Sequence, residues 1–444
     1  MRCFHVQPGG TLGGTLQVPG DKSVSHRAIM FSAIADGRSR ITGFLESADC
    51  LATLRAFEAM GVSFVRDAES LVVDGVGRDG LAPPGMPLDL GNSGTSMRLL
   101  SGLMAGQAFD SVLSGDASLS RRPMGRVIDP LTAMGAHIAG SEGQRAPLRI
   151  TGGRSLQAIE YTPPVASAQI KSCVLLAGLY AKGVTTVHEP GVSRDHTERM
   201  LGAFGVALSR DGAALSLAGG QSLRAFDVAV PADLSSAAFF LVGASIAQPR
   251  DGAEPLTLTG VGINPTRRGV IDILDRMGAD ITLTNTREQA GEPVADIVVR
   301  PASLRGVDIG GRDVELAIDE FPAIFIAAAC AQGTTRLTDA AELRVKESDR
   351  IAVMADGLAA LGVEVSVQPD GLTITGRPEP HSFTGGKIHS HEDHRIAMAF
   401  AMAGLRASAP IEIDDCDYVD TSFPGFVAKA GAAGLVIDAR EQGA

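Results

Sequence analysis

The chain has 444 residues, of which 45% are hydrophobic and 20% are charged, and its formal net charge is -12 at pH 7. This length exceeds what one hydrophobic core usually accommodates, so it predicts two domains. The acidic balance and the low aromatic content of 4% argue against nucleic acid or an anionic membrane as a partner, because such partners need basic patches or aromatic stacking platforms.

The cysteines and the first residues indicate the compartment. Five cysteines are spread along the chain without C-x-x-C pairing, which is typical of reduced thiols in the cytosol. The first residues, MRCFHVQPGG, lack the apolar core of a signal peptide, and no uninterrupted apolar run of about 18 residues follows. We therefore expect a cytoplasmic protein.

A helical pattern that ends in an apolar residue and Gly, followed by a short β-like run, recurs six times at spacings of about 70 residues. In each copy an amphipathic helix is expected to end at a C′ glycine, after which the chain turns into a strand. The six glycines are Gly61, Gly135, Gly205, Gly278, Gly362 and Gly434. Six copies in two domains predict three per domain, with the last copy joined by the N-terminal tail. An open solenoid is the less favoured alternative, because polar motifs are concentrated in the turns.

The first polar motif is GDKSVSHR, which places Lys22, His26 and Arg27 at the start of a predicted helix. Ser23 and Arg27 are four residues apart and should share a helix face. Backbone N–H groups, a hydroxyl and two cations can then converge on one anion. A capped, solvated helix start is the alternative, which is less favoured because first turns prefer acidic residues.

Two further motifs follow in the first half of the chain. GNSGTSMR opens a predicted helix at Asn92, and Gly94 there lets a ligand approach the backbone; a plain helix cap explains this motif equally well. RRPMGR places Arg121 and Arg122 beside Pro123, an arrangement suited to clamping an anion. Surface solvation is the alternative for these arginines.

The motif SAQIKS puts Ser167, Ala168 and Gln169 at another predicted helix start. Taken alone, it is best interpreted as an N-cap followed by a solvated lysine, Lys171. Downstream, the segment GVSRDHTERM adds Arg194.

In the second half, Asp319 and Glu320 directly precede a long apolar helix. A carboxylate in that place either complements the helix dipole or is partly desolvated and basic. The motif RVKESDR then brings Lys346, Glu347 and Arg350 together.

The string HSHEDHRIAMAF contains His389, His391, His394 and Arg395. We disfavour a metal site here, because the histidines are predicted on a polar loop, no Cys/His cluster completes a ligand set, and Arg395 would repel a cation.

Predicted helix starts in both halves thus carry Lys, Arg, Ser, Asn or Gln. Helix N-termini with cations favour a ligand that has more than one anionic group. Asp319 and Glu347, placed among these cations, are expected to transfer protons. A non-catalytic anion-binding repeat protein is an alternative, but buried carboxylates would weaken simple anion binding.

The six motifs GDKSVSHR, GNSGTSMR, RRPMGR, SAQIKS, RVKESDR and DHRIAMAF together resemble the enolpyruvyl transferase family, and within it the branch that accepts shikimate 3-phosphate. The resemblance implies an α/β (α+β) fold with two domains of three βαβαββ units each, helices buried inside and sheets outside. It places one domain at residues 19–231 and the other at 1–18 plus 232–444. UDP-N-acetylglucosamine enolpyruvyl transferases are the alternative. They carry Lys-Asn where this chain has Lys22 and Ser23, and they use a loop Cys that residues 118–126 lack.

The resemblance also implies the reaction. The 5-hydroxyl of shikimate 3-phosphate would attack phosphoenolpyruvate, and an addition–elimination would release phosphate, as a step of the shikimate pathway of aromatic amino-acid biosynthesis. No metal or cofactor is implied. The family is commonly monomeric, and its domains are expected to close on the first substrate.

Site residues follow from the resemblance, motif by motif. Shikimate 3-phosphate is expected to be held by Lys22, Ser23, Arg27, Ser167, Ala168, Gln169, Arg194, Asp319 and Lys346. Phosphoenolpyruvate is expected to meet Lys22, Asn92, Gly94, Arg122, Gln169, Arg350, His394 and Arg395. Asp319 would take the hydroxyl proton, and Glu347 with Lys22 would move the proton at C3. Two positions differ from some relatives: Thr421 replaces a Lys, and Glu342 replaces an Asn.

Overall fold

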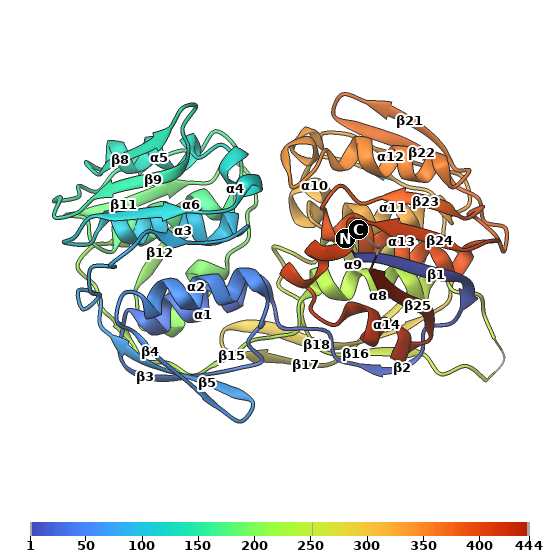
Figure 1. Cartoon of the computed structure of the whole chain (residues 1–444), viewed down its shortest axis with the longest axis horizontal. Coiled ribbons are helices and arrows are strands. Elements are labelled where there is room, and N and C mark those ends of the chain that lie inside the picture. The colour runs from blue at the N-terminus through green and yellow to red at the C-terminus, as the bar shows by residue number, and fades with distance from the viewer. Residues whose placement is uncertain (1, 251, 442–444) are drawn as a thin grey trace. The chain divides into compact units, whose positions relative to one another are not determined.

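The computed structural model describes residues 2–250 and 252–441. The chain folds as two compact units (Figure 1). Unit 1 comprises residues 1–19, 231–288 and 293–444, and unit 2 comprises residues 20–230 and 289–292. Each unit has its own cluster of buried hydrophobic side chains, so each has an independent core.

Three sheets form unit 2 within the described residues, with the strand orders β14-β3-β5-β4, β6-β7-β9-β8 and β10-β11-β13-β12, and β15 also pairs with β3. In each sheet the first pair is parallel and the next two pairs are antiparallel. The strands are β3 (Ala35–Thr42), β4 (Ser63–Asp67), β5 (Ser70–Val76), β6 (Leu88–Asp89), β7 (Ser111–Ser114), β8 (His137–Ser141), β9 (Arg145–Thr151), β10 (Glu160–Tyr161), β11 (Val184–His188), β12 (Leu208–Asp211), β13 (Ala214–Ala218), β14 (Leu223–Arg224) and β15 (Val228–Ala229).

The helices of unit 2 divide into inner and outer ones. They are α1 (Lys22–Ala33), α2 (Ala48–Glu58), α3 (Gly94–Ala105), α4 (Ala117–Arg121), α5 (Gly125–Ala133), α6 (Ala168–Gly178) and α7 (His196–Ala203). The inner helices α1, α3 and α6 are buried around most of their circumference. Strand β9 alternates between buried and exposed residues, as expected for a sheet with one face on the core and one in solvent. The predicted arrangement of helices inside and sheets outside is therefore confirmed.

Unit 1 has the same sheet pattern, with the orders β2-β16-β18-β17, β19-β20-β22-β21 and β23-β24-β1-β25 among its described residues. Strand β1, drawn in blue, lies between the red strands β24 and β25 (Figure 1). The strands are β1 (Arg2–Gly10), β2 (Gly14–Leu16), β16 (Leu256–Gly262), β17 (Asp280–Gln289), β18 (Glu292–Arg300), β19 (Asp308–Ile309), β20 (Thr334–Leu337), β21 (Glu364–Gln368), β22 (Gly371–Thr375), β23 (Gly386–His389), β24 (Ile411–Asp414) and β25 (Leu435–Glu441).

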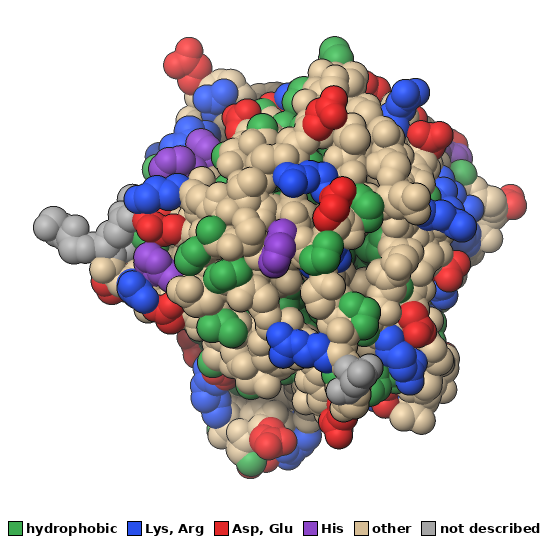
Figure 2. Space-filling view, turned by 90° about the vertical axis from the view of Figure 1, so that its right-hand side faces the viewer, with side chains coloured by type: hydrophobic (Ala, Val, Ile, Leu, Met, Phe, Trp, Pro, Cys, Tyr) green, Lys and Arg blue, Asp and Glu red, His purple; other side chains and the backbone are tan. Residues whose placement is uncertain are grey.

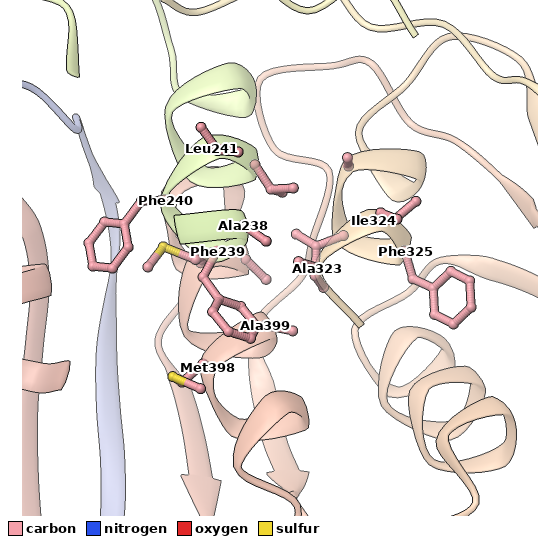
Figure 3. Close-up of a cluster of buried hydrophobic side chains, with 14 of the residues drawn as sticks. Ala238, Phe239, Phe240, Leu241, Ala323, Ile324, Phe325, Met398 and Ala399 are labelled. Carbon is pink, nitrogen blue, oxygen red and sulfur yellow. The ribbon is translucent and has the colours of Figure 1, made fainter. Parts of the chain in front are cut away.

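Three inner helices, α8, α11 and α13, form the core of unit 1. Their side chains meet in Figure 3, where Phe239 of α8, Ile324 of α11 and Met398 of α13 are labelled. The helices are α8 (Leu234–Ile246), α9 (Gly269–Arg276), α10 (Arg312–Ala317), α11 (Phe321–Ala329), α12 (Arg350–Ala360), α13 (His394–Ala403) and α14 (Phe426–Ala433), with short 3-10 helices at Ala341–Val345, Gly404–Arg406 and Cys416–Thr421. Every residue of α8 and α11 is buried, as expected for helices that are apolar all round.

The six repeat glycines each follow an outer helix and precede an edge strand, as the sequence pattern predicts. All of them have φ between 82° and 115°, a backbone conformation that costs other residues roughly 1–2 kcal/mol. They are Gly61, Gly135, Gly205, Gly278, Gly362 and Gly434. The repeat is therefore a structural unit in which glycine ends each outer helix.

The mixture of side chains on the surface is consistent with sheets whose outer faces are in solvent. In the view of Figure 2, hydrophobic side chains are scattered singly among Lys, Arg, Asp and Glu. All five cysteines are buried and free of disulfides. No helix in the described part of the chain is long and apolar enough to cross a membrane.

Candidate active site

In unit 2, the predicted site residues gather at the N-termini of the inner helices. Helix α1 begins at Lys22, and the carboxylate of Asp21 caps it by accepting a hydrogen bond of 2.9 Å from the backbone N–H of Val24. The ammonium group of Lys22 forms an ion pair with Asp49 of α2. The first turn of α1 contains no acidic residue. The charge of Lys22 and the free backbone N–H groups therefore lie at the same helix N-terminus, where both attract anions.

Arg27 lies one turn further along α1, and its side chain is only 3% exposed. Its guanidinium donates to the carbonyl of Ser23 at 2.9 Å, to Ser172 Oγ at 2.9 Å and to Thr197 Oγ1 at 2.7 Å. Burial lowers the pKa of Arg27 to about 10, although Glu198 opposes this change. Arg27 therefore stays charged at neutral pH and joins α1 to α6 and α7 behind the first turn.

His26 belongs to a buried polar chain rather than to the cationic cluster. Its Nδ1 lies 2.8 Å from Thr53 Oγ1 and 3.4 Å from Ser96 Oγ, and Ser96 Oγ also donates to Ser93 Oγ at 2.6 Å. Burial, with Lys22 and the neighbouring arginine, lowers the pKa of His26 well below its ordinary value. His26 is therefore neutral and fixes α1, α2 and α3 relative to one another.

Gly94 is the first residue of α3, and two arginines line its bare backbone. A Cβ added at Gly94 would lie 2.8 Å from Arg98 Nη1 and 3.2 Å from Arg122 Nη1. Asn92 holds Arg122 by accepting from its Nη2 at 2.7 Å, and Asn92 in turn donates to Asp116 at 2.8 Å. The structure thus brings Asn92, Gly94 and Arg122 together as the sequence analysis expected.

Helix α6 joins the same cluster. Ser167 caps it, and Ala168 and Gln169 are its first two residues. Gln169 donates to Thr95 Oγ1 at 3.0 Å and accepts from Arg98 Nη1 at 2.9 Å. Arg98 was not predicted as a site residue, although its place one turn after the start of α3 was a usable signal.

Lys171 corrects one sequence-based interpretation. It was interpreted as a solvated lysine, but its side chain is only 1% exposed and forms ion pairs with Glu189 and Glu198. Arg194 lies half-buried in the segment just before α7. The sequence could not reveal these pairs, because the carboxylates belong to other segments of the chain.

The expectation that phosphoenolpyruvate meets Gly94 can be tested with a variant at this position. In a Gly94→Ala variant, the new methyl group presses on Arg98 and Arg122. Both contacts are ends of flexible side chains, so the protein is expected to fold with these guanidiniums displaced. If phosphoenolpyruvate meets these guanidiniums, as expected from the sequence, loss of one charge-assisted hydrogen bond should raise its KM about tenfold. Steady-state kinetics measures this change, with Gly85→Ala as the control because no atom lies within 4 Å of a Cβ there; equal KM values would contradict the role of Gly94.

Unit 1 holds the second group of predicted residues, around Asp319. Asp319 Oδ1 lies 3.6 Å from Lys346 Nζ and 3.5 Å from Arg350 Nη1. Arg395, in the first turn of α13, donates from Nη1 to the carbonyl of Asp319 at 3.0 Å. The structure therefore brings a carboxylate and three predicted cations together at the starts of α11, α12 and α13.

Arg350 is completely buried, with 0% of its side chain exposed. Its Nε donates to Asp393 Oδ2 at 2.8 Å, and its Nη2 donates to Glu347 Oε2 at 2.7 Å. Burial alone would lower the pKa of Arg350, but Asp393 and Glu347 raise it above its ordinary value. Conversely, burial would raise the pKa of Asp393, but Arg350 lowers it below the ordinary value. The pair is thus fully charged at neutral pH.

The histidine string is only partly a loop, which corrects the prediction for two of its three histidines. His394 is the first residue of α13 and is buried, whereas His389 ends β23 and forms a 2.6 Å contact with Asp414. His391 lies in the turn between them. The described residues contain no group of His, Cys, Asp and Glu side chains arranged to hold a metal ion.

Two charged residues near this cluster were given no site role from the sequence: Glu320, which was noted only as a carboxylate before a long apolar helix, and Arg267, which no motif included. Glu320 is 1% exposed, accepts a hydrogen bond from Ser235 and lies 4.0 Å from Arg395 Nη1. Arg267 donates to Asp233 at 2.8 Å and to Ser235 at 2.7 Å at the start of α8. The string ADLSSAAFF was a usable signal, since it has the same polar start before an apolar helix.

The geometry defines two chemically different clusters. Unit 2 offers helix N-termini, amides, hydroxyls and guanidiniums, which suit anions with several oxygen atoms. Unit 1 offers carboxylates hydrogen-bonded among cations, which suit proton transfer beside a developing negative charge.

The fold is that of the enolpyruvyl transferases. The structure matches NikO, an enolpyruvyl transferase from Streptomyces tendae, with a TM-score of 0.79 at 19% identity, covering 100% of this chain and 99% of that one. The EPSP synthase of Acinetobacter baumannii matches with a TM-score of 0.89 at 52% identity, covering 99% of this chain and all of that one. This chain belongs to the EPSP synthase (3-phosphoshikimate 1-carboxyvinyltransferase) family, whose sequence model matches residues 6–430.

Curated relatives agree with this assignment. The 3-phosphoshikimate 1-carboxyvinyltransferase of Alkalilimnicola ehrlichii is 62% identical over 98% of this chain and 96% of its own length. That of Halorhodospira halophila is 60% identical over 98% and 97%. The predicted fold class and the predicted transferase of the shikimate pathway are therefore confirmed, and the UDP-N-acetylglucosamine branch is not favoured.

Proposed function

We propose that the chain transfers the enolpyruvyl group of phosphoenolpyruvate to the 5-hydroxyl of shikimate 3-phosphate and releases phosphate. The observation that carries this proposal is the environment of Asp319, whose carboxylate lies near Lys346 and Arg350 and whose carbonyl accepts from Arg395. A base among cations can take a proton from a hydroxyl while the same cations stabilise anionic substrates.

The acceptor, shikimate 3-phosphate, carries a phosphate and a carboxylate. We assign its binding to the first turns of α1 and α6 and to the charged side chains near them, because free N–H groups and cations together hold anions. In unit 1, we assign binding of the acceptor to Asp319 and Lys346. The acceptor-binding residues are Lys22, Ser23, Arg27, Ser167, Ala168, Gln169, Arg194, Asp319 and Lys346.

The donor, phosphoenolpyruvate, also carries a carboxylate and a phosphate. The bare backbone at Gly94 beside two guanidiniums suits one of these groups, and the cations at the starts of α12 and α13 suit the other. The donor-binding residues are Lys22, Asn92, Gly94, Arg122, Gln169, Arg350, His394 and Arg395.

The reaction proceeds by addition and then elimination. The acceptor oxygen attacks C2 of phosphoenolpyruvate while Asp319 takes the hydroxyl proton and C3 gains a proton from Glu347 or Lys22. The tetrahedral intermediate then loses a C3 proton to the same group as the C–O bond to phosphate breaks. Glu347 lies 2.7 Å from Arg350 Nη2, which holds the carboxyl group in one orientation.

A Glu347→Gln variant tests the C3 proton transfer. It keeps the size of the side chain and its bond to Arg350 but cannot exchange a proton, so kcat should fall about a hundredfold with little change in substrate binding. Single-turnover phosphate release measures the change, and unchanged turnover would remove Glu347 from the mechanism.

Phosphate release tests the proposed function directly. The enzyme is incubated with phosphoenolpyruvate alone, with added shikimate 3-phosphate, or with added UDP-N-acetylglucosamine. Release is expected only with shikimate 3-phosphate. Release with the nucleotide sugar would favour the related branch, and binding without any release would favour a non-catalytic anion-binding protein.

The two clusters lie on different units, so the proposal requires both to act on one pair of substrates. We further propose a cytoplasmic monomer whose units close on the acceptor, since anions relieve the repulsion between cations. Light scattering tests the monomer, and small-angle X-ray scattering with and without shikimate 3-phosphate tests closure; identical radii of gyration would count against it.

A further inference from the structure

A network of charged side chains lies next to the proposed acceptor-binding residues of unit 2. Lys171 Nζ contacts Glu189 Oε1 at 2.8 Å and Glu198 Oε1 at 2.6 Å. Arg210, which is 44% exposed, contacts Glu189 Oε2 at 2.9 Å and Glu198 Oε1 at 3.1 Å. The charges of two cations and two carboxylates balance, and Lys171, at 1% exposure, is the most deeply buried of the four side chains.

The network adjoins the proposed acceptor-binding residues at two places. Lys171 lies two residues after Gln169 on α6, and its backbone N–H donates to the carbonyl of Ser167 at 3.1 Å. At the other end, Ser193 Oγ donates to Glu189 Oε1 at 2.6 Å, and Arg194 follows directly in the chain.

The segment that carries Arg194 is held in part by such side-chain contacts. Residues 189–195, between β11 and α7, form no helix or strand. Together with the backbone bond from Glu189 N–H to the carbonyl of Ala213 at 3.0 Å and the bond from Arg199 Nε to Asp195 at 2.8 Å, the bond between Ser193 and Glu189 helps to fix this irregular segment. Burial raises the pKa of Glu189, but Lys171, Ser193 and Arg210 lower it to below its ordinary value, so Glu189 is an anion that needs its cationic partners.

We propose that Lys171 is a positioning residue for the acceptor, which acts through Glu189 and Ser193 to hold Arg194 where its guanidinium meets an anionic group of shikimate 3-phosphate. The inference rests on the proposed function. Without the lysine, Glu189 and Glu198 would repel each other across a poorly solvated space. Glu189 would then move toward solvent, and Ser193 and Arg194 would move with it.

Two single variants test the proposal. Lys171→Met removes the charge and keeps the length of the side chain, and Ser193→Ala removes only the bond to Glu189. Each should raise the KM and the calorimetric Kd for shikimate 3-phosphate about tenfold, while the KM for phosphoenolpyruvate and kcat change less than about threefold. Lys182→Met, which changes an exposed lysine beyond the end of α6, is the matched control. If Lys171→Met does not fold, the Kd of Ser193→Ala for shikimate 3-phosphate tests the proposal on its own.

Combined variants separate positioning from general destabilisation. Lys171→Met with Glu189→Gln removes the unbalanced charge, so its Kd for shikimate 3-phosphate should recover part of the loss. Ser193→Ala should add nothing to Arg194→Ala, because both changes act through the same guanidinium. Wild-type affinity in Ser193→Ala and Lys171→Met, or fully additive effects of Ser193→Ala and Arg194→Ala, would overturn the proposal. Absence of phosphate release by the wild-type enzyme would instead refute the proposed function, and the Kd series would still test the positioning of Arg194.

Discussion

Replacing Asp319 by Asn is expected to lower kcat by about 10²- to 10⁴-fold. The amide keeps the shape of the carboxyl group near Lys346 and Arg350 but cannot accept the hydroxyl proton. Phosphate release under single-turnover conditions measures the chemical step, and calorimetry with shikimate 3-phosphate measures binding. Binding should change only a few-fold, because loss of an interaction made in the transition state lowers kcat and not affinity.

The control for this variant is Asp313→Asn, which neutralises a partly exposed carboxylate on α10 paired with Arg276. It should leave both kcat and binding unchanged. If Asp319→Asn turned over at the wild-type rate, another group would have to accept the proton, and the observation that carries the proposed function would be lost.

Replacing Asp393 by Asn should destabilise unit 1 by up to about 3 kcal/mol, because the buried guanidinium of Arg350 loses its fully buried carboxylate partner and keeps only Glu347 and Asp319. Asp393 and Arg350 are both fully buried. Asn can still accept at the start of α13, where Asp393 caps the helix, so the variant isolates the effect of charge. Urea unfolding at pH 7 measures the loss. Asp438→Asn is the control, since its pair with Arg440 is about half exposed and should contribute less than about 1 kcal/mol.

The same pair predicts a pH dependence. Because the folded-state pKa of Asp393 is lowered, its contribution to stability is present above the unfolded Asp value of about 3.9. It is lost as the pH falls through the lower folded-state value. The difference in unfolding free energy between wild type and Asp393→Asn should therefore be constant from about pH 7 to pH 5 and shrink below about pH 4. A difference that grew in acid would show that Asp393 is not the charged partner.

The fold was predictable because its signals are local. The repeat glycines required only a count along the sequence, and each has the positive φ that a C′ glycine adopts. Helix α1 begins at Lys22, where the motif GDKSVSHR predicted a helix start. The fold class then followed from six short motifs. What local signals could not give was the sheet order, since β1 pairs with strands from the other end of the chain.

The sequence allowed us to predict which residues form the candidate site, but not how deeply each of them is buried. The motifs supplied Gly94, Gln169 and Asp319, and the structure places each at an inner helix start. Burial was the missing quantity. Lys171 was interpreted as solvated because its partners lie on other segments, and burial withdraws it from water. The assigned binding and proton-transfer roles stay predictions until the variants are measured.

The place of β1 has a consequence for synthesis of the chain on the ribosome. Phe4 pairs with Ile413, so β1 emerges about 400 residues before its neighbour in the sheet, a delay of at least about 20 s at typical translation rates. Every strand of the three sheets of unit 2 lies between residues 35 and 229. The three sheets of that unit can therefore form early in translation, while the leading strand β1 has to wait for β24 and β25 before it can complete its pairing.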